Sequence, residues 1–278
     1  MKYSFIIPTF NRISSLKKCI LSIENQIFNP FDYEIIVVND GGEIPALNNI
    51  KLIHQSNQGP ASARNSGAKI AQGAYLIFVD DDCELDKNWL SKIDFKVQEN
   101  VLLTGYTKNI IPSLWAEASQ TLLNYLYDAW KNCEWSFFAS NNMVISKIDF
   151  DKVGGFNENF PLAAAEDREF CLRAIRMKIQ LVQVNEALVY HSHHLNFTSY
   201  CKQHTNYGKG AYYFNDVLKQ YQLKIPVQPF VFYLKMILFP FKNQTFINAI
   251  VVSAMIFFSQ IINLYGFFTL KNTNNAKQ

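Results

Sequence analysis

The chain has 278 residues, of which 49% are apolar and 18% are charged, and its formal net charge is +3. This balance excludes an intrinsically disordered chain, a collagen-like repeat and a small domain that depends on disulfides. The charge is unevenly divided: residues 1–199 carry 18 Lys and Arg against 22 Asp and Glu, and residues 200–278 carry 8 against 1. The pattern predicts a neutral to acidic body with a basic, surface-seeking tail.

The cysteines are scattered and form no C-x-x-C pair, which excludes zinc-ribbon and thioredoxin-like spacing. An odd, scattered set is typical of a reducing compartment, where most thiols are buried as small apolar side chains. The first apolar run ends at Pro8 and is too short for a signal peptide. We therefore expect the chain to fold in the cytoplasm. The five cysteines are Cys19, Cys83, Cys133, Cys171 and Cys201.

The first eighty residues alternate between apolar runs and helical periodicity. Residues 3–8 are rich in aromatic and β-branched side chains and end at a proline, which predicts a strand, and apolar residues recur at helical spacing over 13–27. Nearly continuous apolar runs at 33–40 and 74–82 flank a helical stretch at 60–71. Such strands, alternating with helices, are typical of right-handed βαβ units. The predicted fold class is α/β with a doubly wound, mostly parallel sheet.

The middle of the chain is less regular. Its pattern predicts a strand over 101–107 and an aromatic helix over 113–131. A helix over 166–178 is expected to open with acidic and close with basic residues, an order that complements the helix dipole. A further strand is predicted over 180–190.

Residues 226–241 and 246–270 are strongly apolar, and the second segment has no charge in 25 positions, so its length suits a membrane span. Lys235 interrupts the first segment. Polar residues share one helical face of the second: Asn248, Ser259 and Asn263. We therefore favour a pair of helices lying in the membrane interface over a spanning hairpin. The alternative is a helical pair that covers the core or a second copy of the chain. The predicted domains are 1–200, catalytic, and 201–278, basic, apolar and helical.

Two of the predicted strands end directly in acidic residues, the first at Asp40 and the second at Asp80, Asp81 and Asp82. In an open α/β sheet, ligands bind outside the carboxyl ends of the strands. Carboxylates gathered there are costly unless a cation or hydrogen-bond donors accompany them, and hard oxygen ligands suit Mg²⁺ or Mn²⁺. The alternatives are a solvated acidic turn that caps the next helix and, for Asp40, a residue that only shapes a turn.

Glu166 and Asp167 stand at a predicted helix start, where acids are ordinary dipole partners, but an Asp there also suits general base catalysis. His191 ends a predicted strand and is followed by His193 and His194, and imidazole is a ligand for Mn²⁺. Residue type alone does not choose among the three histidines.

Taken together, these segments resemble the family 2 glycosyltransferases, which are inverting nucleotide-sugar enzymes of the GT-A fold. The resemblance covers roughly residues 2–195. The matching segments follow in order: FIIPTFNR, VVNDGG, GPASARNSGAKIAQGAYLIFVDDD, ASNNMVISK with VGGFNENF, AEDREFCLRA and VYH. Any acid-terminated strand can supply one such match, whereas six in order are specific.

The resemblance implies a role for each matching residue. Asp167 is expected to be the catalytic base, with Glu166 contacting the acceptor or orienting the base. Asp82 is expected to hold Mn²⁺ or Mg²⁺ with Asp80 and His191. The nucleotide-sugar is expected to contact Pro8, Thr9, Asn11, Arg12, Asp40, Arg64, Asp80 and Asp81.

Two departures from the family pattern are visible. Asn39 stands where an acid is common, and the Q-x-x-R-W signature of processive members is missing, because no Trp follows an Arg. We therefore expect transfer of a single sugar in each binding event. The aromatic residues Trp115, Trp130 and Trp135 are expected to serve mainly as core, although tryptophans can also stack on sugars.

Other interpretations of the chain are weaker. A dinucleotide-binding fold needs G-x-G-x-x-G after the first strand, and a P-loop needs Gly-Lys-Ser/Thr; neither is present. The basic residues of the tail lie among apolar ones, which argues against a nucleic-acid partner. A non-catalytic protein that binds sugar or membrane is disfavoured because Asp82 and Asp167 are both present.

The function predicted is therefore transfer of a sugar from a nucleotide-sugar, most readily a UDP-sugar, to a glycan or lipid-linked acceptor in cell-surface glycan assembly. The tail predicts a peripheral or monotopic protein at the cytoplasmic membrane face.

Overall fold

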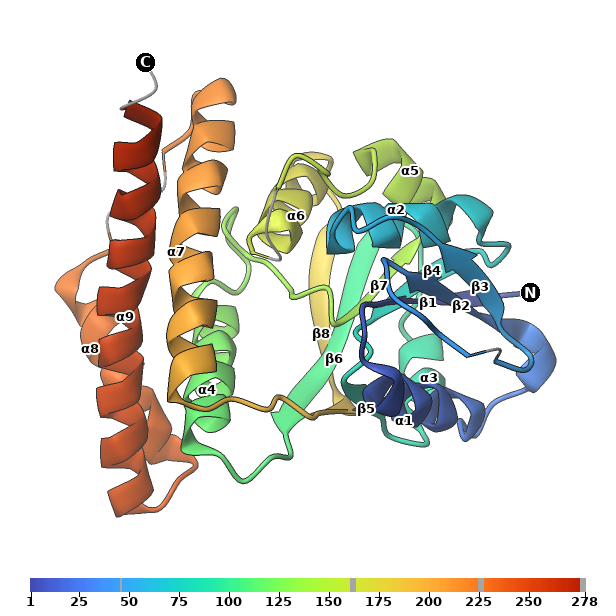
Figure 1. The fold of residues 1–278 in the computed structure, drawn as a ribbon, viewed down its shortest axis with the longest axis horizontal. Helices are drawn as coiled ribbons and strands as arrows, with labels where there is room; N and C mark the ends of the chain where they lie inside the picture. The colour runs from blue at the N-terminus through green and yellow to red at the C-terminus, as the bar shows by residue number, and fades with distance from the viewer. Residues whose placement is uncertain (46, 161–163, 225–227, 276–278) are drawn as a thin grey trace. The chain divides into compact units, whose positions relative to one another are not determined.

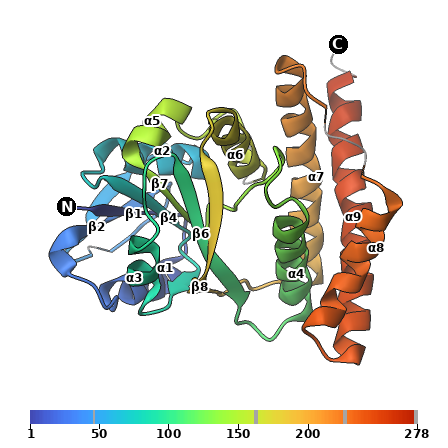
Figure 2. The same cartoon turned by 180° about the vertical axis from the view of Figure 1, so that it is seen from behind.

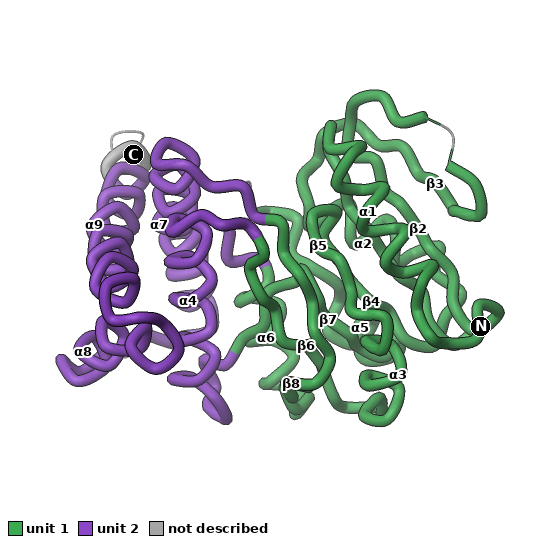
Figure 3. The backbone as a smooth tube through the Cα atoms, turned by 90° about the horizontal axis from the view of Figure 1, so that it is seen from below, with its two compact units in different colours: residues 1–110, 137–161, 167–192 green, residues 111–136, 162–166, 193–278 purple. Residues whose placement is uncertain are grey.

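A computed structural model of the chain describes residues 1–45, 47–160, 164–224 and 228–275. It divides into two compact units, coloured separately in Figure 3. Unit 1 comprises Met1–Ile110, Phe137–Pro161 and Asp167–Ser192, and unit 2 comprises Ile111–Ser136, Leu162–Glu166 and His193–Gln278. The predicted domain boundary at residue 200 stays a prediction.

Unit 1 contains an eight-stranded sheet in the order β3-β2-β1-β4-β7-β6-β8-β5 (Figure 1). The strands are β1 (Tyr3–Thr9), β2 (Tyr33–Asn39), β3 (Lys51–His54), β4 (Tyr75–Val79), β5 (Cys83–Leu85), β6 (Val101–Asn109), β7 (Asn142–Ser146) and β8 (Gln180–His191). The four strands β3, β2, β1 and β4 are mutually parallel, as are β6 and β8, whereas β7 runs antiparallel to both of its neighbours and β5 runs antiparallel to β8. The predicted α/β class is confirmed, with a mixed sheet.

Helices cover both faces of this sheet (Figures 1 and 2). They are α1 (Ile13–Glu24), α2 (Pro60–Ile70), α3 (Trp89–Asp94), α5 (Lys147–Val153) and α6 (Glu166–Arg176), with a short 3-10 turn η1 (Pro30–Asp32) before β2. On one face, α1 and α3 pack on alternate residues of the strands, and α1 forms because Leu16, Cys19, Ile20 and Ile23 bury one helical stripe.

The other face is held by aromatic rings. Phe78 of β4 lies 5.3 Å from the ring of Phe150 and 5.2 Å from that of Phe156, measured between centroids. Phe156 in turn stacks on Phe170 of α6 at 4.6 Å. Such offset and edge contacts stabilise a core beyond the area they bury, so α5 and α6 are fixed against β4 next to its acidic end.

Pro8 does not end the first strand, contrary to the expectation from the sequence, but lies inside it opposite Val38 of β2. Pairing of β1 with β4, by contrast, stops at Ile6 and Phe78. The backbone carbonyl of Thr9 accepts a hydrogen bond from the amide of Asp40, which follows β2. In a strand, the backbone groups of successive residues point toward opposite neighbouring strands, so those of Pro8 point toward β4. Because proline has no N–H to donate, it is tolerated here and the β1–β4 seam opens beyond it.

Unit 2 is helical: α4 (Leu114–Ala129), α7 (Phe197–Gln220), α8 (Phe230–Leu238), the 3-10 turn η2 (Phe239–Lys242) and α9 (Phe246–Asn275). Helices α7 and α9 lie side by side (Figures 1 and 2). They touch at glycines, because a Cβ on Gly208 would lie 2.0 Å from the carbonyl oxygen of Asn263, and one on Gly266 would lie 2.2 Å from that of Thr205. By length and composition alone, Phe246–Lys271 is apolar enough to cross a membrane, with a mean hydropathy of 1.9.

Candidate active site

The open seam between β1 and β4 is the place where the chain's strand order reverses. The chain moves outward from β1 to β2 and β3 on one side, and returns to β4 on the other. At such a switch point the loops after neighbouring strands diverge and leave a crevice for a ligand. The loop after β1 carries Asn11 and Arg12, and the loop after β4 carries Asp80, Asp81 and Asp82.

Asp81 points into the protein and ties the two loops together. Its side chain is fully buried, accepts a hydrogen bond of 2.7 Å from the hydroxyl of Thr9, and pairs with the guanidinium of Arg12 at 2.7 Å. Burial raises the pKa of the Asp81 carboxyl to about 6, although Arg12 and Thr9 act to lower it. Both oxygens are thus engaged within the protein, which favours a structural contribution to the site.

Asp82 follows Asp81 in the tight turn between β4 and β5, in which the amide of Cys83 donates to the carbonyl of Asp80 at 3.0 Å. The Oδ2 of Asp82 accepts a hydrogen bond of 2.7 Å from Nη1 of Arg12, and its Oδ1 lies 3.3 Å from Nε2 of His191. His191 is brought here because β5 pairs antiparallel with β8, which places it opposite Cys83. The predicted pair Asp82 and His191 is therefore assembled from residues 109 positions apart in the chain.

Asp82, Cys83 and His191 form a cluster whose donor atoms all lie within 4.8 Å of one another. A carboxylate oxygen and an imidazole nitrogen together suit Mn²⁺, and the carboxylate alone suits Mg²⁺. Burial raises the pKa of the Cys83 thiol well above its ordinary value, which disfavours the thiolate form. The residues present fit a divalent cation held by oxygen and nitrogen.

Asp80 lies at the end of β4 and is partly exposed. Nη2 of Arg64, which comes from α2, donates to its Oδ1 at 2.8 Å. Arg64 is only 4% exposed, and its guanidinium lies 5.6 Å from the ring centroid of Phe156. A buried cation fixed on an aromatic ring is well placed to orient a carboxylate or a phosphate.

Asp167, at the start of α6, interacts electrostatically with Arg64 and Asp80. Burial raises the pKa of its carboxyl; the backbone amide of Arg168 at 2.7 Å and the charges of Arg64 and Arg168 lower it, and Asp80 raises it. Arg168 is held over the ring of Phe137, with 5.0 Å to the centroid. A carboxylate with a raised pKa beside arginines is suited to accept a proton.

Asp40 organises the segment that leads into α2. Its Oδ1 accepts from the side chain of Gln55 at 2.7 Å and from the amide of Gln58 at 2.8 Å, and its Oδ2 accepts from the amide of Gly59 at 2.8 Å. The neighbouring Asn39 donates to the carbonyl of Gly42 at 2.8 Å, which an acid could not do at neutral pH. This contact explains why an amide occupies that position.

Two further predicted residues belong to β1 and to the loop after it, and others belong to unit 2. Asn11 sits in the exposed loop after β1 with a φ of 55°, and Pro8 is part of β1. Glu166 is buried and belongs to unit 2, as do His193 and His194. In unit 2, Trp115 lies 5.1 Å from the ring of Tyr200 and Trp130 stacks on Phe232, so both serve as packing.

Some residues of the site carried no individual sequence signal. The carbonyl of Asn141 accepts the amide of Asp80, and the side chain of Asn142 accepts the amide of Gly105 at 3.1 Å. The first bond follows from β7 lying beside β4, and the second from β7 lying beside β6. The repeated Asn in ASNNMV was the available clue, because buried amides before a short apolar run satisfy backbone groups at a strand end.

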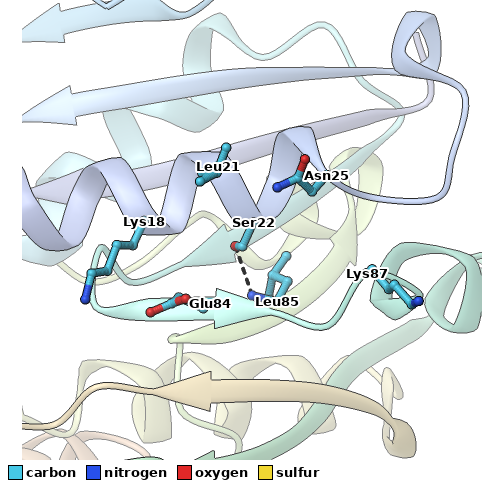
Figure 4. Close-up of a pocket in the computed structure, with 7 residues that line it drawn as sticks. All are labelled: Lys18, Leu21, Ser22, Asn25, Glu84, Leu85 and Lys87. Carbon is cyan, nitrogen blue, oxygen red and sulfur yellow. Dashed lines mark hydrogen bonds between the residues drawn. The ribbon is translucent and has the colours of Figure 1, made fainter.

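A separate shallow hollow lies between α1 and β5 (Figure 4). It is lined by Lys18, Leu21, Ser22, Asn25, Glu84, Leu85 and Lys87. The Ser22 hydroxyl there accepts the amide of Leu85 at 3.0 Å, which fastens β5 to α1. None of the predicted site residues lines it, so it contributes to the site only by holding β5 in register.

Comparison with known proteins places this geometry in context. Residues 4–154 match the protein family described as "Glycosyl transferase family 2", and residues 109–269 match the family described as "Glycosyl transferase family group 2". The chain is 32% identical over 100 residues to glycosyltransferase AglE of Haloferax volcanii, covering 32% of this chain and 33% of the relative. The matches to two further relatives, uncharacterized glycosyltransferases of Rickettsia bellii and Bacillus subtilis, span 16% and 31% of the length of those proteins.

Two solved structures share the fold at low identity. S. aureus TarS 1-349 in complex with UDP has a TM-score of 0.54 and 18% identity, covering all of this chain and 92% of its own. The mannosyltransferase PcManGT of Pyrobaculum calidifontis, in complex with GDP-Man and Mn²⁺, has a TM-score of 0.59 and 13% identity, covering 99% and 79%.

Proposed function

The chain belongs to glycosyl transferase family 2, and on that premise we propose that it is an inverting, non-processive glycosyltransferase. It moves one sugar from a nucleoside diphosphate donor, UDP being the expected nucleotide, to an acceptor hydroxyl. The observation that carries this proposal is the meeting of Asp80 and Asp82 with Arg64, Arg12 and His191 beside the open seam.

The charge pattern at the seam supports a diphosphate ligand. Asp82 and His191 offer oxygen and nitrogen to Mn²⁺ or Mg²⁺, with Asp80 the further oxygen ligand predicted. A bound cation of this kind would neutralise charge on the departing nucleoside diphosphate. Arg64, buried and fixed, orients Asp80 and directs positive potential toward the same edge.

Asp167 is proposed as the general base. Its carboxylate takes the proton from the acceptor hydroxyl as that oxygen attacks the anomeric carbon, while the bond to the nucleoside diphosphate breaks on the opposite face. One displacement inverts the anomeric configuration, and no enzyme nucleophile is needed. Its raised pKa supports the role, since a base is most effective when its pKa approaches the working pH. Glu166 as an acceptor contact stays a prediction.

The nucleotide is proposed to lie along the loop after β1, where Pro8, Thr9 and Asn11 border the seam. Asp40 and Asp81 are proposed to shape this pocket. The missing Q-x-x-R-W signature supports single transfer. The proposed acceptor is a glycan or lipid-linked saccharide of the cell surface, and the proposed location is the cytoplasmic face of the membrane, as a peripheral or monotopic protein.

The test is a thermal-shift panel of the purified chain with UDP, GDP, dTDP and NAD, each with and without Mn²⁺. We expect one nucleoside diphosphate to raise the melting temperature, with a larger rise when Mn²⁺ is present. The variant Asp82→Asn should lose the metal-dependent part, and Asp151→Asn, an exposed acid on α5, should keep it. No shift with any nucleotide in a folded sample would refute the proposal in favour of a non-catalytic protein.

A further inference from the structure

Unit 2 leaves one side of α9 uncovered along most of the helix. At 100° per residue the exposed apolar residues fall within about a third of the circumference, and they continue for about 33 Å. We call this set the outer stripe: Phe246, Ile247, Ile250, Phe257, Phe258, Ile261, Leu264, Tyr265 and Phe268. Each of these side chains is between 37% and 75% exposed.

Helix α8 and the turn η2 extend the same kind of surface, and both pack beside α9. Their large exposed apolar residues are Phe230, Val231, Tyr233, Leu234, Leu238 and Phe241. Single exposed apolar residues are normal on a soluble surface, but a continuous set of this size marks an interaction site. We call the outer stripe together with these residues the apolar face.

The opposite side of α9 is committed to the protein. Ser253 donates to the carbonyl of Ile237 at 2.6 Å, and the hydroxyl of Tyr200 donates to the carbonyl of Met255 at 2.9 Å. Ser259 is fully buried, and Asn263 is the residue whose carbonyl crowds Gly208 of α7. These polar groups of α9 therefore face the rest of unit 2, whereas Asn248 near the start of the helix is exposed. The residues of the apolar face carry no polar side-chain atom except tyrosine hydroxyls, and the Lys235 amine lies beside them.

This packing bears on how α9 meets a membrane. Helix α7 runs beside α9 in the same direction, from Phe197 next to Phe258 to Tyr212 next to Phe267. If α9 crossed a bilayer, this stretch of α7 would enter the hydrocarbon with it. It carries Lys202, which is exposed, and ionisable residues facing hydrocarbon are strongly disfavoured.

The charges of the segment fit an anionic surface. No Asp or Glu occurs from residue 217 to the end of the sequence, whereas Lys224, Lys235, Lys242 and Lys271 are all exposed. Lys242 has Asp128 at 3.8 Å, a loose pair in which both groups are exposed to solvent. Lysines at the rim of an apolar surface place their charges at the level of lipid headgroups.

We propose that unit 2 docks on an anionic bilayer through the apolar face, with α9 lying in the plane of the membrane instead of crossing it. The inference rests on the membrane location named in the proposed function and assigns its geometry. Its tests measure membrane binding and not sugar transfer, so the docking proposal and the proposed activity can fail independently.

The first test is co-flotation of the full chain with vesicles of phosphatidylcholine, with and without about one-third phosphatidylglycerol. We expect binding to be stronger to the anionic vesicles. Phe257→Glu and Ile261→Glu, both in the outer stripe, should each weaken it roughly tenfold or more. Phe31→Glu and Phe95→Glu are matched controls, because these residues of unit 1 are 85% and 84% exposed, and they should bind as the unaltered chain does.

The second test distinguishes lying from crossing. Thr245→Cys and Lys271→Cys, placed at the two ends of the outer stripe in a Cys133→Ser background, are treated with a membrane-impermeant maleimide. We expect both positions to be labelled in inside-out membrane vesicles and neither in intact spheroplasts. Labelling of one end from each side would overturn the in-plane arrangement.

Two results would overturn docking itself. One is failure to float with either vesicle while the chain is folded. The other is a concentration-dependent dimer in lipid-free sedimentation that Phe257→Glu dissociates, with no vesicle binding by the unaltered chain; the occupant of the apolar face would then be a second copy.

Discussion

Replacing Asp40 by Asn tests whether this residue acts mainly on the ligand or on the fold. The substitution keeps the shape of the side chain and removes its charge. The three groups that donate to Asp40 are the side chain of Gln55 and the amides of Gln58 and Gly59. An Asn can keep its oxygen toward the first two, but its NH₂ group then faces the amide of Gly59.

The size of the effect follows from this count. One buried amide loses its acceptor, at a cost of about 1–3 kcal/mol, and two charge-assisted bonds become neutral ones, at roughly half their strength. Asp40 is 5% exposed, so solvent does not compensate. We expect Asp40→Asn to destabilise unit 1 by about 2–4 kcal/mol, which corresponds to a fall in melting temperature of roughly 5–15 °C.

The assay is denaturant unfolding together with nucleotide titration, on Asp40→Asn and on the control Asp151→Asn, which changes an exposed acid and should leave stability within about 0.5 kcal/mol. If Asp40→Asn is as stable as the parent but binds nucleotide much more weakly, Asp40 acts on the ligand directly and its mainly structural role is refuted.

Four further outcomes are expected. Asp167→Asn should lower kcat by about 10²–10⁴ with donor binding retained, and an unchanged kcat would exclude it as the base. Because burial raises the pKa of Asp167, activity should fall on acidification at a higher pH than an ordinary Asp, near 3.9, would give; a pH profile with its limb at that ordinary value contradicts the shift. Gly208→Ala should destabilise by roughly 1–3 kcal/mol in denaturant unfolding despite better helix propensity, because its Cβ would meet the Asn263 carbonyl, and a more stable variant would show that the helices part easily. Asn39→Asp should cost about 1–3 kcal/mol at pH 7, measured in the same way, since it removes the donor to Gly42.

Long apolar strands and their acidic ends were predictable from the sequence, because burial on both faces requires a run such as YEIIVVN and nothing in such a core explains a terminal Asp. The helices with a clear apolar stripe were predictable for the same reason. Short elements were not: β5 has three residues and β3 has four, and a run of that length has no periodicity to detect.

Other features depend on partners distant in the chain. The antiparallel direction of β7 is set by its placement between β4 and β6, and no residue within it encodes that choice. The pairing of Arg12 with Asp81 and Asp82 likewise depends on a loop 69 residues before Asp81. Because Arg12 is half exposed, its sequence context is that of an ordinary surface charge. The acidic strand ends were predictable, but the ion pairs that join them to Arg12, Arg64 and His191 required the fold.

The proline in the central strand also bears on how the enzyme can diversify. Pro8 leaves β1 with no donor toward β4, so the backbone itself ends the ladder between these strands at Ile6 and Phe78. Side chains in the loops after β1 and β4 can therefore change in size or polarity without disturbing a hydrogen-bonded ladder or the buried layers beneath. A scaffold of this kind separates the end of its ladder from the chemistry of the loops beside it, so selection can alter those loops while the stability of the sheet stays the same.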